Sequence, residues 1–545
     1  MFDAATPAGG KGVTSVASFD SPITIGDHLV GYYTVHGGEL IEFPWEYSYP
    51  WPQRPWDLEV WPVSLYTNTT DQACSPLPDD TPNLEDYFVL FGEYDAGSDI
   101  TFYVGRGNTF TASSIFRETA EIFLEILRAG HTLRITIDNL NNSPIKTFRF
   151  ENHLNPGAVS TFSSWGPNFD LDLKPQFGAP GRYIDSLWFV DEGSYTYLSG
   201  TGSAVAFAAA AYALIAEARG VKPEPKLFES LFASTAKAQL YSWNAPYQNF
   251  LAPVSQQGAG LIQVYDAAFT KAYLEPSGLS FNDTANFAGP LTFTIVNMGD
   301  EATFDISYVS SQTFYSLDDD ETYSPVTPGE RSTETAELSF SETKVTVAAG
   351  STATVEVTAS PPEGLNAKRY PYWSGFITVN GTDGSALSIP YQGIVGSLYE
   401  ANVLPYMLTY SSDDAYYTPI YDNQTFYVPE QGVEFDWQDY SVTAPVLELD
   451  LPWGAREVFI EVVPATTCTK LPTPGGYVNF NNDFVPRGYS WQNEAVWAGR
   501  LASGEYAPAG RYILVARVQR LFSEGTKDED WVSIATPPFF IEYPY

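Results

Sequence analysis

The chain is poor in cysteine and in basic residues, and both scarcities exclude classes of protein. Two cysteines in 545 residues, Cys74 and Cys468, give no basis for a disulfide framework, and whether they pair stays open. Lys and Arg number 27 against 66 Asp and Glu, so the formal net charge is −39. Because such a surface repels nucleic acid and anionic membranes, we expect no nucleic-acid partner. The sequence also predicts no cofactor and no metal site.

Long apolar runs and a leader sequence are missing as well. We find no apolar run long enough to cross a membrane, and so expect no membrane span. Met1-Phe2-Asp3-Ala4 has neither the basic start nor the apolar core of a signal peptide, so either the true start lies upstream or export follows another route. Five sequons, together with the acidity, nevertheless favour a secreted glycoprotein. The candidate glycosylation sites are Asn68, Asn141, Asn282, Asn380 and Asn423.

Turn-forming and aromatic residues are abundant. The chain holds 42 Gly and 40 Pro, and 15% of its residues are aromatic. Gly and Pro interrupt many short apolar runs, a texture typical of all-β domains. At about 150 residues for each domain, a chain of this length predicts three or four domains.

The stretch 162–220 carries the most specific pattern. Its first half contains Ser163-Ser164-Trp165-Gly166-Pro167 and Gly178-Ala179-Pro180-Gly181; its second half begins Ser199-Gly200-Thr201-Gly202-Ser203-Ala204. We predict a strand, a Gly/Pro-rich loop, a second short strand, a tight turn and a helix. Because residues 205–216 are apolar on every face, the helix is expected inside a domain. Its N-terminus would present free N–H groups and a partial positive charge.

At these residues the chain resembles the subtilisin-like serine peptidases (subtilases), especially the large secreted type with a protease-associated (PA) insert and a fibronectin-like domain. The family's nucleophile motif reads Ser-Gly-Thr-Ser-Met-Ala, and alignment without gaps places Gly202 at the nucleophile. Glycine has no hydroxyl to attack a carbonyl, so the acyl-enzyme step has no nucleophile. Ser203 is the fallback nucleophile, but one step along a helix turns its side chain by about 100°. A plain helix-start serine is the favoured interpretation.

The resemblance also implies a catalytic Asp, a catalytic His and an oxyanion Asn, which in the family come before the segment matched by residues 13–17. None of the four histidines, His28, His36, His131 and His153, stands in the family's His-Gly-Thr-His motif. His36-Gly37-Gly38 and Asp95-Ala96-Gly97 are faint echoes that fit ordinary turns better. No intact catalytic residue is therefore predicted. The resemblance makes Ser163, Ser164, Trp165 and Gly166 the candidates for a substrate groove.

The predicted fold class is a multidomain protein of α/β and all-β parts. Residues 1–24 and 145–270 are expected to form a partial subtilase domain with a parallel sheet, and residues 25–144 an abbreviated PA-like insert. Residues 277–395 are predicted to be a fibronectin type III-like β-sandwich, and residues 396–545 a second sandwich. In the first part, strands 13–17, 159–163 and 183–187 should be neighbours in a parallel sheet, with helix 203–218 on one face.

Local patterns predict further elements. Apolar spacing favours a helix over residues 116–129 that is capped by Ser114, and alternation favours a strand over residues 133–137. A second helix is expected at 225–237. Residues 344–359 alternate around Ala349-Gly350 and are interpreted as a hairpin.

Three functions remain open at this point. The first is a subtilase-derived pseudoenzyme that binds a peptide or protein ligand. The second is a fragment of an active secreted subtilisin-like endopeptidase, and the third is an extracellular structural or interaction β-protein. The family resemblance implies an extracellular or cell-wall location, and the oligomeric state is not predicted.

Overall fold

The computed structural model describes most of the chain. The described residues are 2, 7–47, 55–62, 65, 87–90, 100–106, 109–115, 117–138, 142–152, 154–189, 195–243, 245–320, 323–439, 441–465, 483–485, 494–501 and 503–544. Eleven residues named above lie outside these ranges: Met1, Asp3, Ala4, Asn68, Cys74, Asp95, Ala96, Gly97, Asn141, His153 and Cys468.

A parallel pair of strands forms the centre of the first part. Strand β1 (Val16–Phe19) pairs in parallel with β10 (Phe177–Pro180), with Val16 opposite Phe177. The expected neighbours differ: Val159 makes only an isolated antiparallel bridge to Phe19, and residues 184–187 lie elsewhere. Gly178 was predicted to lie in a loop but belongs to β10. A Cβ at this position would overlap the Phe19 ring. Glycine thus permits the close approach of the two strands.

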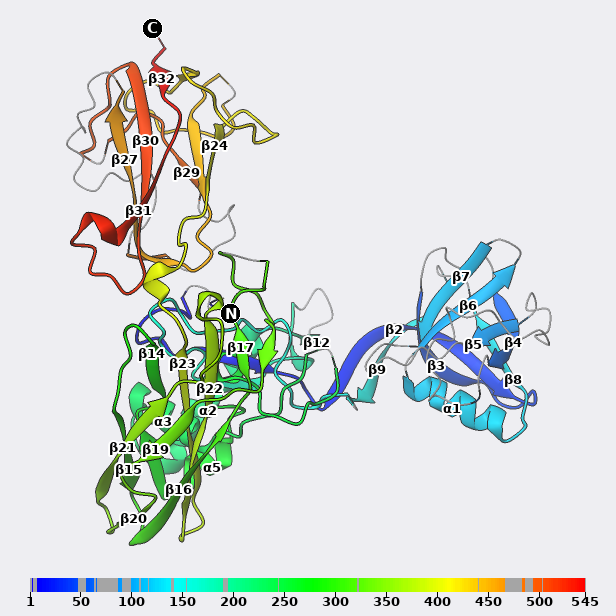
Figure 1. The fold of residues 1–545 in the computed structure, drawn as a ribbon. Coiled ribbons are helices and arrows are strands. Elements are labelled where there is room, and N and C mark those ends of the chain that lie inside the picture. Colours follow the sequence, from blue (N-terminus) through cyan, green and yellow to red (C-terminus); the bar gives the residue numbers. More distant parts are fainter. Residues whose placement is uncertain are drawn as a thin grey trace.

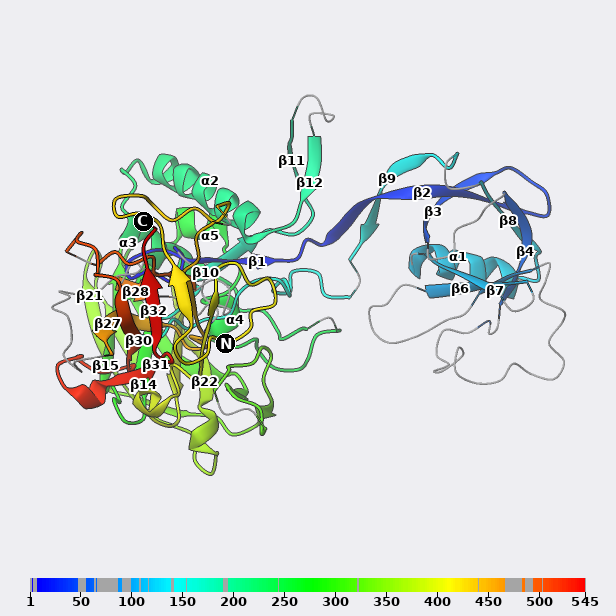
Figure 2. The same cartoon turned by 90° about the horizontal axis from the view of Figure 1, so that it is seen from above.

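Strands β11 (Ile184–Leu187) and β12 (Tyr195–Leu198) pair antiparallel with each other as a separate hairpin. The prediction that residues 183–187 join the parallel sheet is therefore wrong. Figure 2 shows this hairpin projecting from the body beside a two-stranded ribbon of β2 (Ile23–Val35) and β9 (Ile145–Glu151). Arg149 and Asp185 join the hairpin to that ribbon through an ion pair of 2.8 Å.

Helix α2 (Thr201–Arg219) packs against the β1–β10 pair through one narrow face. That face consists of Ala204, Ala208, Ala211 and Ile215. The prediction of an enclosed helix is wrong, because Leu214 on another face is 58% exposed. By length and composition α2 alone among the described helices qualifies to cross a membrane, contrary to expectation. Its packing on β1, β10 and α5 (Val264–Phe269) is that of a helix within a folded domain.

Two shorter helices complete this part. Helix α3 (Pro225–Thr235) confirms the helix expected at 225–237, and α4 (Val254–Gln257) follows it. Phe228 and Phe232 of α3 pack on Tyr212 of α2, with ring centroids 5.5 and 5.1 Å apart. These contacts fix the two helices to each other and to β10.

A distal lobe, residues 23–151, stands apart from the body on a ribbon of β2 (Ile23–Val35) and β9 (Ile145–Glu151) (Figure 1). Its strands follow the order β3-β7-β6-β5-β4-β8-β2-β9, and β3 also pairs with β2, so the sheet closes on itself. The remaining bounds are β3 (Ile41–Tyr47), β4 (Trp56–Pro62), β5 (Tyr87–Leu90), β6 (Ile100–Arg106), β7 (Thr109–Ile115) and β8 (Leu133–Ile137).

Helix α1 (Arg117–Arg128) packs against this lobe through Phe123, whose ring lies 5.4 Å from Phe43 and 5.1 Å from Tyr33. The predicted helix and the strand at 133–137 are confirmed. The predicted cap is wrong, because Ser114 belongs to β7 and pairs with Glu46.

Residues 272–394 form two facing sheets. One has the order β13-β15-β21-β19 and the other β14-β23-β22-β16-β20, with β17 paired to β22 and β18 paired to β17. The bounds are β13 (Ala272–Glu275), β14 (Leu279–Asp283), β15 (Leu291–Asn297), β16 (Ala302–Ser310), β17 (Thr313–Tyr315), β18 (Arg331–Ser332), β19 (Glu337–Phe340), β20 (Lys344–Val347), β21 (Thr352–Ser360), β22 (Pro371–Gly381) and β23 (Ala386–Ile394).

The hairpin predicted at 344–359 is wrong. Strand β20 pairs with β16 in one sheet, whereas β21 pairs with β15 and β19 in the other. Residues 348–351 therefore cross between the sheets. Alternating residues and a Gly turn look alike at a hairpin and at a sheet-crossing corner, because both strands bury one face.

The C-terminal residues form two further sheets, β24-β26-β29 and β25-β32-β30-β27-β28, with β31 beside β30. The bounds are β24 (Met407–Ser411), β25 (Thr425–Tyr427), β26 (Pro445–Leu449), β27 (Ala455–Pro464), β28 (Asp483–Val485), β29 (Glu494–Val496), β30 (Gly510–Gln519), β31 (Trp531–Ala535) and β32 (Phe539–Glu542). Figure 1 places this region at the end opposite β16 and β20.

One apolar cluster runs through the junction of these regions. The ring of Trp165 lies 5.7 Å from Phe314 of β17, and Trp453 lies 4.9 Å from Phe2 and 5.0 Å from Tyr370. All five residues belong to a single buried cluster. The α/β region and both C-terminal regions therefore contribute to one shared cluster at their junction, beside separate clusters within residues 272–394 and around α2.

We expect Trp165→Ala to lower the free energy of unfolding by about 3–5 kcal/mol, because it leaves a cavity in a fully buried site. Trp165→Phe should cost much less, since Trp165 Nε1 has no hydrogen-bond partner among the described residues and its removal unpairs nothing. Urea unfolding followed by circular dichroism measures both. The exposed neighbour Ser164→Ala is the control, and an equal loss in all three variants would contradict the shared core.

Candidate functional site

Backbone hydrogen bonds join three chain segments at the turn that leads into α2. Gly181 N–H donates to Phe19 O at 3.0 Å, and Gly200 N–H donates to Gly181 O at 2.8 Å. A Cβ on Gly181 would overlap Ser18 Oγ and approach Gly200 O within 2.8 Å. Glycine is thus required at position 181, where the end of β1 meets the start of the helix.

Gly202 lies in the exposed first turn of α2. A Cβ added at this position would meet nothing within 4 Å, so the space for a longer side chain is open. Ser203 is half-buried, and its N–H donates to Gly200 O at 3.1 Å. No side chain caps this helix. The site therefore offers backbone N–H groups and no hydroxyl at position 202.

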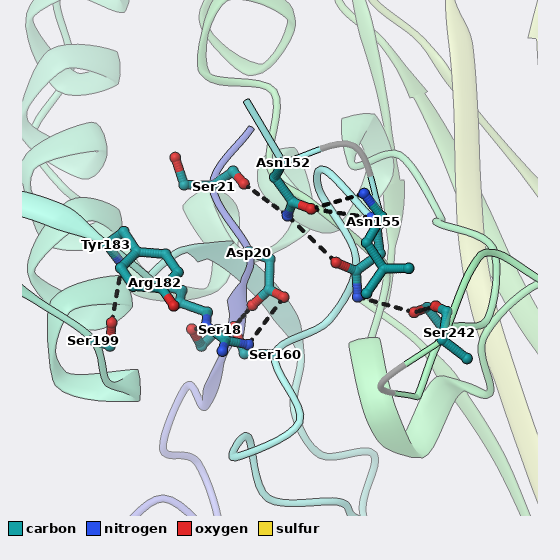
Figure 3. Close-up of polar contacts among 12 residues, drawn as sticks. Ser18, Asp20, Ser21, Asn152, Asn155, Ser160, Arg182, Tyr183, Ser199 and Ser242 are labelled. Atoms are coloured by element: carbon teal, nitrogen blue, oxygen red, sulfur yellow. Dashed lines mark hydrogen bonds and ion pairs between the residues drawn. The ribbon is translucent and has the colours of Figure 1, made fainter. Parts of the chain in front are cut away.

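A buried polar cluster lies beside this turn (Figure 3). Asp20, only 5% exposed, accepts a hydrogen bond from Ser160 Oγ at 2.6 Å and pairs with Arg182 Nη1 at 3.3 Å. Ser160 Oγ in turn lies 3.0 Å from Ser18 Oγ. Burial raises the pKa of the Asp20 carboxyl, although Ser160 and Arg182 act in the opposite direction. The sequence carries no signal for this cluster, because its members are scattered along the chain.

A second set of polar contacts holds the root of the ribbon (Figure 3). Asn152 Nδ2 donates to Ser21 O at 3.2 Å and to Asn155 Oδ1 at 3.3 Å, and Asn155 Nδ2 donates to Ser242 Oγ at 3.0 Å. Because Ser21 follows Asp20 directly, these contacts continue the buried cluster. The distal lobe is therefore anchored next to the α2 turn.

The four groove candidates are mostly internal. Ser163 Oγ accepts from the N–H of Ser18 at 3.1 Å, and Trp165 lies in the shared core. Gly166 N–H donates to Ser255 O at 2.7 Å, and a side chain at Gly166 would overlap the Lys174 carbonyl. Only Ser164 is exposed. In this structure the segment supports β1 and does not form the open wall of a groove.

Lys174, which belongs to the same motif-bearing stretch, is a buried cation. It is 2% exposed, and its Nζ donates to the carbonyls of Gly10, at 3.0 Å, and Val13. Burial lowers the pKa of this ammonium. The contacts tie the segment before β1 to the segment before β10.

The described histidines lie away from Gly202. His28 is on the ribbon strand β2, over Gly26. His36 and His131 meet at the distal lobe, where Nε2 and Nδ1 are 2.7 Å apart. Among the described residues, no group of three or more His, Cys, Asp and Glu side chains is arranged to hold a metal ion.

Three of the five sequon asparagines are described. Asn380 is exposed on β22, whereas Asn282 Nδ2 donates to Asn286 O at 3.3 Å. Asn423 Oδ1 accepts from Arg511 Nε at 2.8 Å. Among these three, Asn380 is therefore the sequon with the least encumbered amide.

Comparisons with known proteins agree with this architecture. The subtilase family profile matches residues 4–260, and an Fn3-like domain profile matches residues 279–392. The PI-type proteinase of Lactococcus lactis subsp. cremoris is 27% identical over 278 residues, covering 46% of this chain and 14% of that protein. The PII-type proteinase of Lacticaseibacillus paracasei is 27% identical over 274 residues, with the same shares. The E. coli chaperone DraB, a solved structure, is 10% identical over 50% of this chain and 96% of its own, with a TM-score of 0.15.

The parallel strands β1 and β10, the glycine-rich turn and helix α2 all lie within the residues that the subtilase family profile matches. Residues 4–260 belong to the subtilase family, and residues 279–392 form an Fn3-like domain. The chain spans about one seventh of the length of the curated relatives named here (14%).

The buried Asp20 predicts a specific dependence of stability on pH. Its pKa is raised in the fold, so the folded state binds the proton more readily than the unfolded chain. Ionisation of Asp20 therefore destabilises the protein as the pH rises from about 4 through the raised pKa. Relative to wild type, Asp20→Asn should become more stable over that window and keep its advantage above it.

Urea unfolding at a series of pH values between about 4 and 8 measures this difference. Asp185→Asn, which removes an exposed carboxylate outside the buried cluster, is the matched control and should follow wild type. A stability difference between Asp20→Asn and wild type that shrinks as the pH rises would refute the assignment.

Proposed function

We propose that this chain is a subtilase-derived protein that does not hydrolyse peptides and acts as a polypeptide-binding module. The observation that carries the proposal is Gly202 at the nucleophile position. The absence of a hydroxyl oxygen at this position does not depend on which residues precede or follow the chain. In subtilisin, the namesake of the family, removal of the nucleophilic serine alone lowers kcat by roughly 10⁶.

Ser203 does not replace the lost hydroxyl. It follows Gly202 in the helix, so its side chain is turned by about 100° from the nucleophile direction. The described histidines lie on the ribbon or in the distal lobe, so none of them stands beside Ser203 as a base. A serine without an adjacent base is a weak nucleophile.

Exposed apolar side chains on the β11–β12 hairpin favour binding of a polypeptide. Leu187 and Tyr195 lie opposite each other in the hairpin and are 74% and 75% exposed. Exposed apolar residues that gather in one region mark interaction surfaces. A structural or interaction β-protein, the third open function, would use the same surface. It differs from the proposed function because its α/β region would bind no ligand.

The finer domain assignment and the location belong to the same proposal. We interpret the closed sheet of the distal lobe as the PA-like insert and residues 396–545 as a second β-sandwich. The net charge of −39 and the exposed Asn380 sequon support an extracellular glycoprotein. The family resemblance supports a location outside the cell or in the cell wall.

We expect the purified chain to show no turnover of a fluorogenic peptide library and no labelling by a fluorophosphonate probe. Gly202→Ser should fold, because the space is open, and should also stay unlabelled, because none of the described histidines lies beside it as a base. Subtilisin in the same assay is the positive control. Labelling of wild type that disappears in Ser203→Ala would overturn the proposal and favour an active endopeptidase. Labelling of Gly202→Ser alone would confine the defect to the nucleophile.

A further inference from the structure

Two histidine rings meet at the exposed surface of the distal lobe, far from the α2 turn. His36 Nε2 and His131 Nδ1 are 2.7 Å apart, and the ring planes cross at 82° with centroids separated by 4.6 Å. The two residues are 95 positions apart in the sequence, so no local spacing predicts the contact. Neither histidine has a part in the proposed function.

The backbone holds both histidines in place. His36 follows β2 with a φ of 52°, and its N–H donates to Thr132 O at 3.2 Å. His131 follows α1, where Gly130 has a φ of 78°. Its N–H donates to Ile126 O at 3.2 Å, the six-residue bond that closes a helix C-terminus. The rings are thus positioned by strand and helix ends rather than by free loops.

The surroundings of the pair suit a cation. Thr132 Oγ1 lies 3.2 Å from His36 Nδ1, so an Nδ1–H that donates to this hydroxyl leaves the lone pair on Nε2, toward His131. A hydrogen bond to the second ring nitrogen is the usual way in which proteins orient a metal-binding histidine. The C-terminus of α1 also directs a partial negative charge toward His131.

We propose that His36 Nε2 and His131 Nδ1 bind one divalent transition-metal ion, with water completing its coordination. Imidazole nitrogen is a preferred ligand for Cu²⁺, Ni²⁺ and Zn²⁺. At metal–nitrogen bonds of about 2.0–2.1 Å, two nitrogens at a right angle on one ion lie about 3 Å apart. The observed 2.7 Å needs only a small opening of the rings. On binding, His131 carries its proton on Nε2, so both liganding nitrogens present lone pairs.

The bound ion joins two separate parts of the distal lobe. His36 marks the end of β2, and His131 stands between α1 and β8. An ion that binds only the folded lobe stabilises it in proportion to the logarithm of metal concentration over Kd. The proposal therefore adds a metal-dependent stability to the lobe, independent of the chemistry at Gly202.

Calorimetric titration of the untagged full chain with CuCl₂, NiCl₂ and ZnCl₂ tests the site. The background carries Cys74→Ser and Cys468→Ser, so that thiols contribute no binding. We expect one ion per chain, with Cu²⁺ bound most tightly. His36→Gln and His131→Gln should each abolish saturable binding, and His28→Gln should leave it unchanged. Thr132→Val should weaken Kd by about tenfold or more through the lost orientation of His36.

Electron paramagnetic resonance of the Cu²⁺ form provides a second readout, in which coupling to two imidazole nitrogens is expected. This measurement on the unsubstituted pair does not depend on how the variants fold. Absence of saturable binding would overturn the proposal and leave the pair as a hydrogen bond. Saturable binding that persists in both His36→Gln and His131→Gln would also overturn it, by placing the ion elsewhere.

Discussion

The buried aromatic contact between Trp165 and Phe314 is the interaction on which the arrangement of the domains depends. It joins the segment after β9 to β17 of the Fn3-like domain, while Trp453 reaches the same cluster from the C-terminal region. Burial of large aromatic rings supplies most of the apolar area in such a junction. The subtilase domain is therefore stabilised by the β-domains and does not depend on its own strands alone.

This support explains how the α2 turn keeps its geometry with a short parallel sheet beneath it. Backbone bonds through Gly181 and Gly200 fix the turn, and the Asp20–Ser160 contact stands behind it in a buried site. Two strands with one narrow helix face bury little apolar surface, since Ala204, Ala208 and Ala211 supply most of the contact. The small size of these side chains also leaves the outer face of α2 exposed.

The family, helices α1, α2 and α3 and the Fn3-like domain were predictable, because they rest on motifs and on periodicity. The pairing of strands was not. Gly178 belongs to β10 for a steric reason that involves Phe19, 159 residues away, and Ala349-Gly350 turns between sheets in a manner that alternation does not distinguish. The Asp20 cluster and the His36–His131 contact were missed because neither has a local pattern. Each is created by the closing of long loops.

Glycine at two positions of the α/β region has different meanings. At Gly181 a side chain has no room, because Ser18, Gly200 and Ala204 surround the Cβ position. At Gly202 an added Cβ meets nothing within 4 Å, and this residue is not one of the described glycines with a positive φ. Glycine is also a poorer helix former than most residues. Nothing among the described residues therefore requires glycine at position 202. Under the proposed assignment of Gly202 to the nucleophile position, the absence of a hydroxyl there has neither a steric nor a backbone cause.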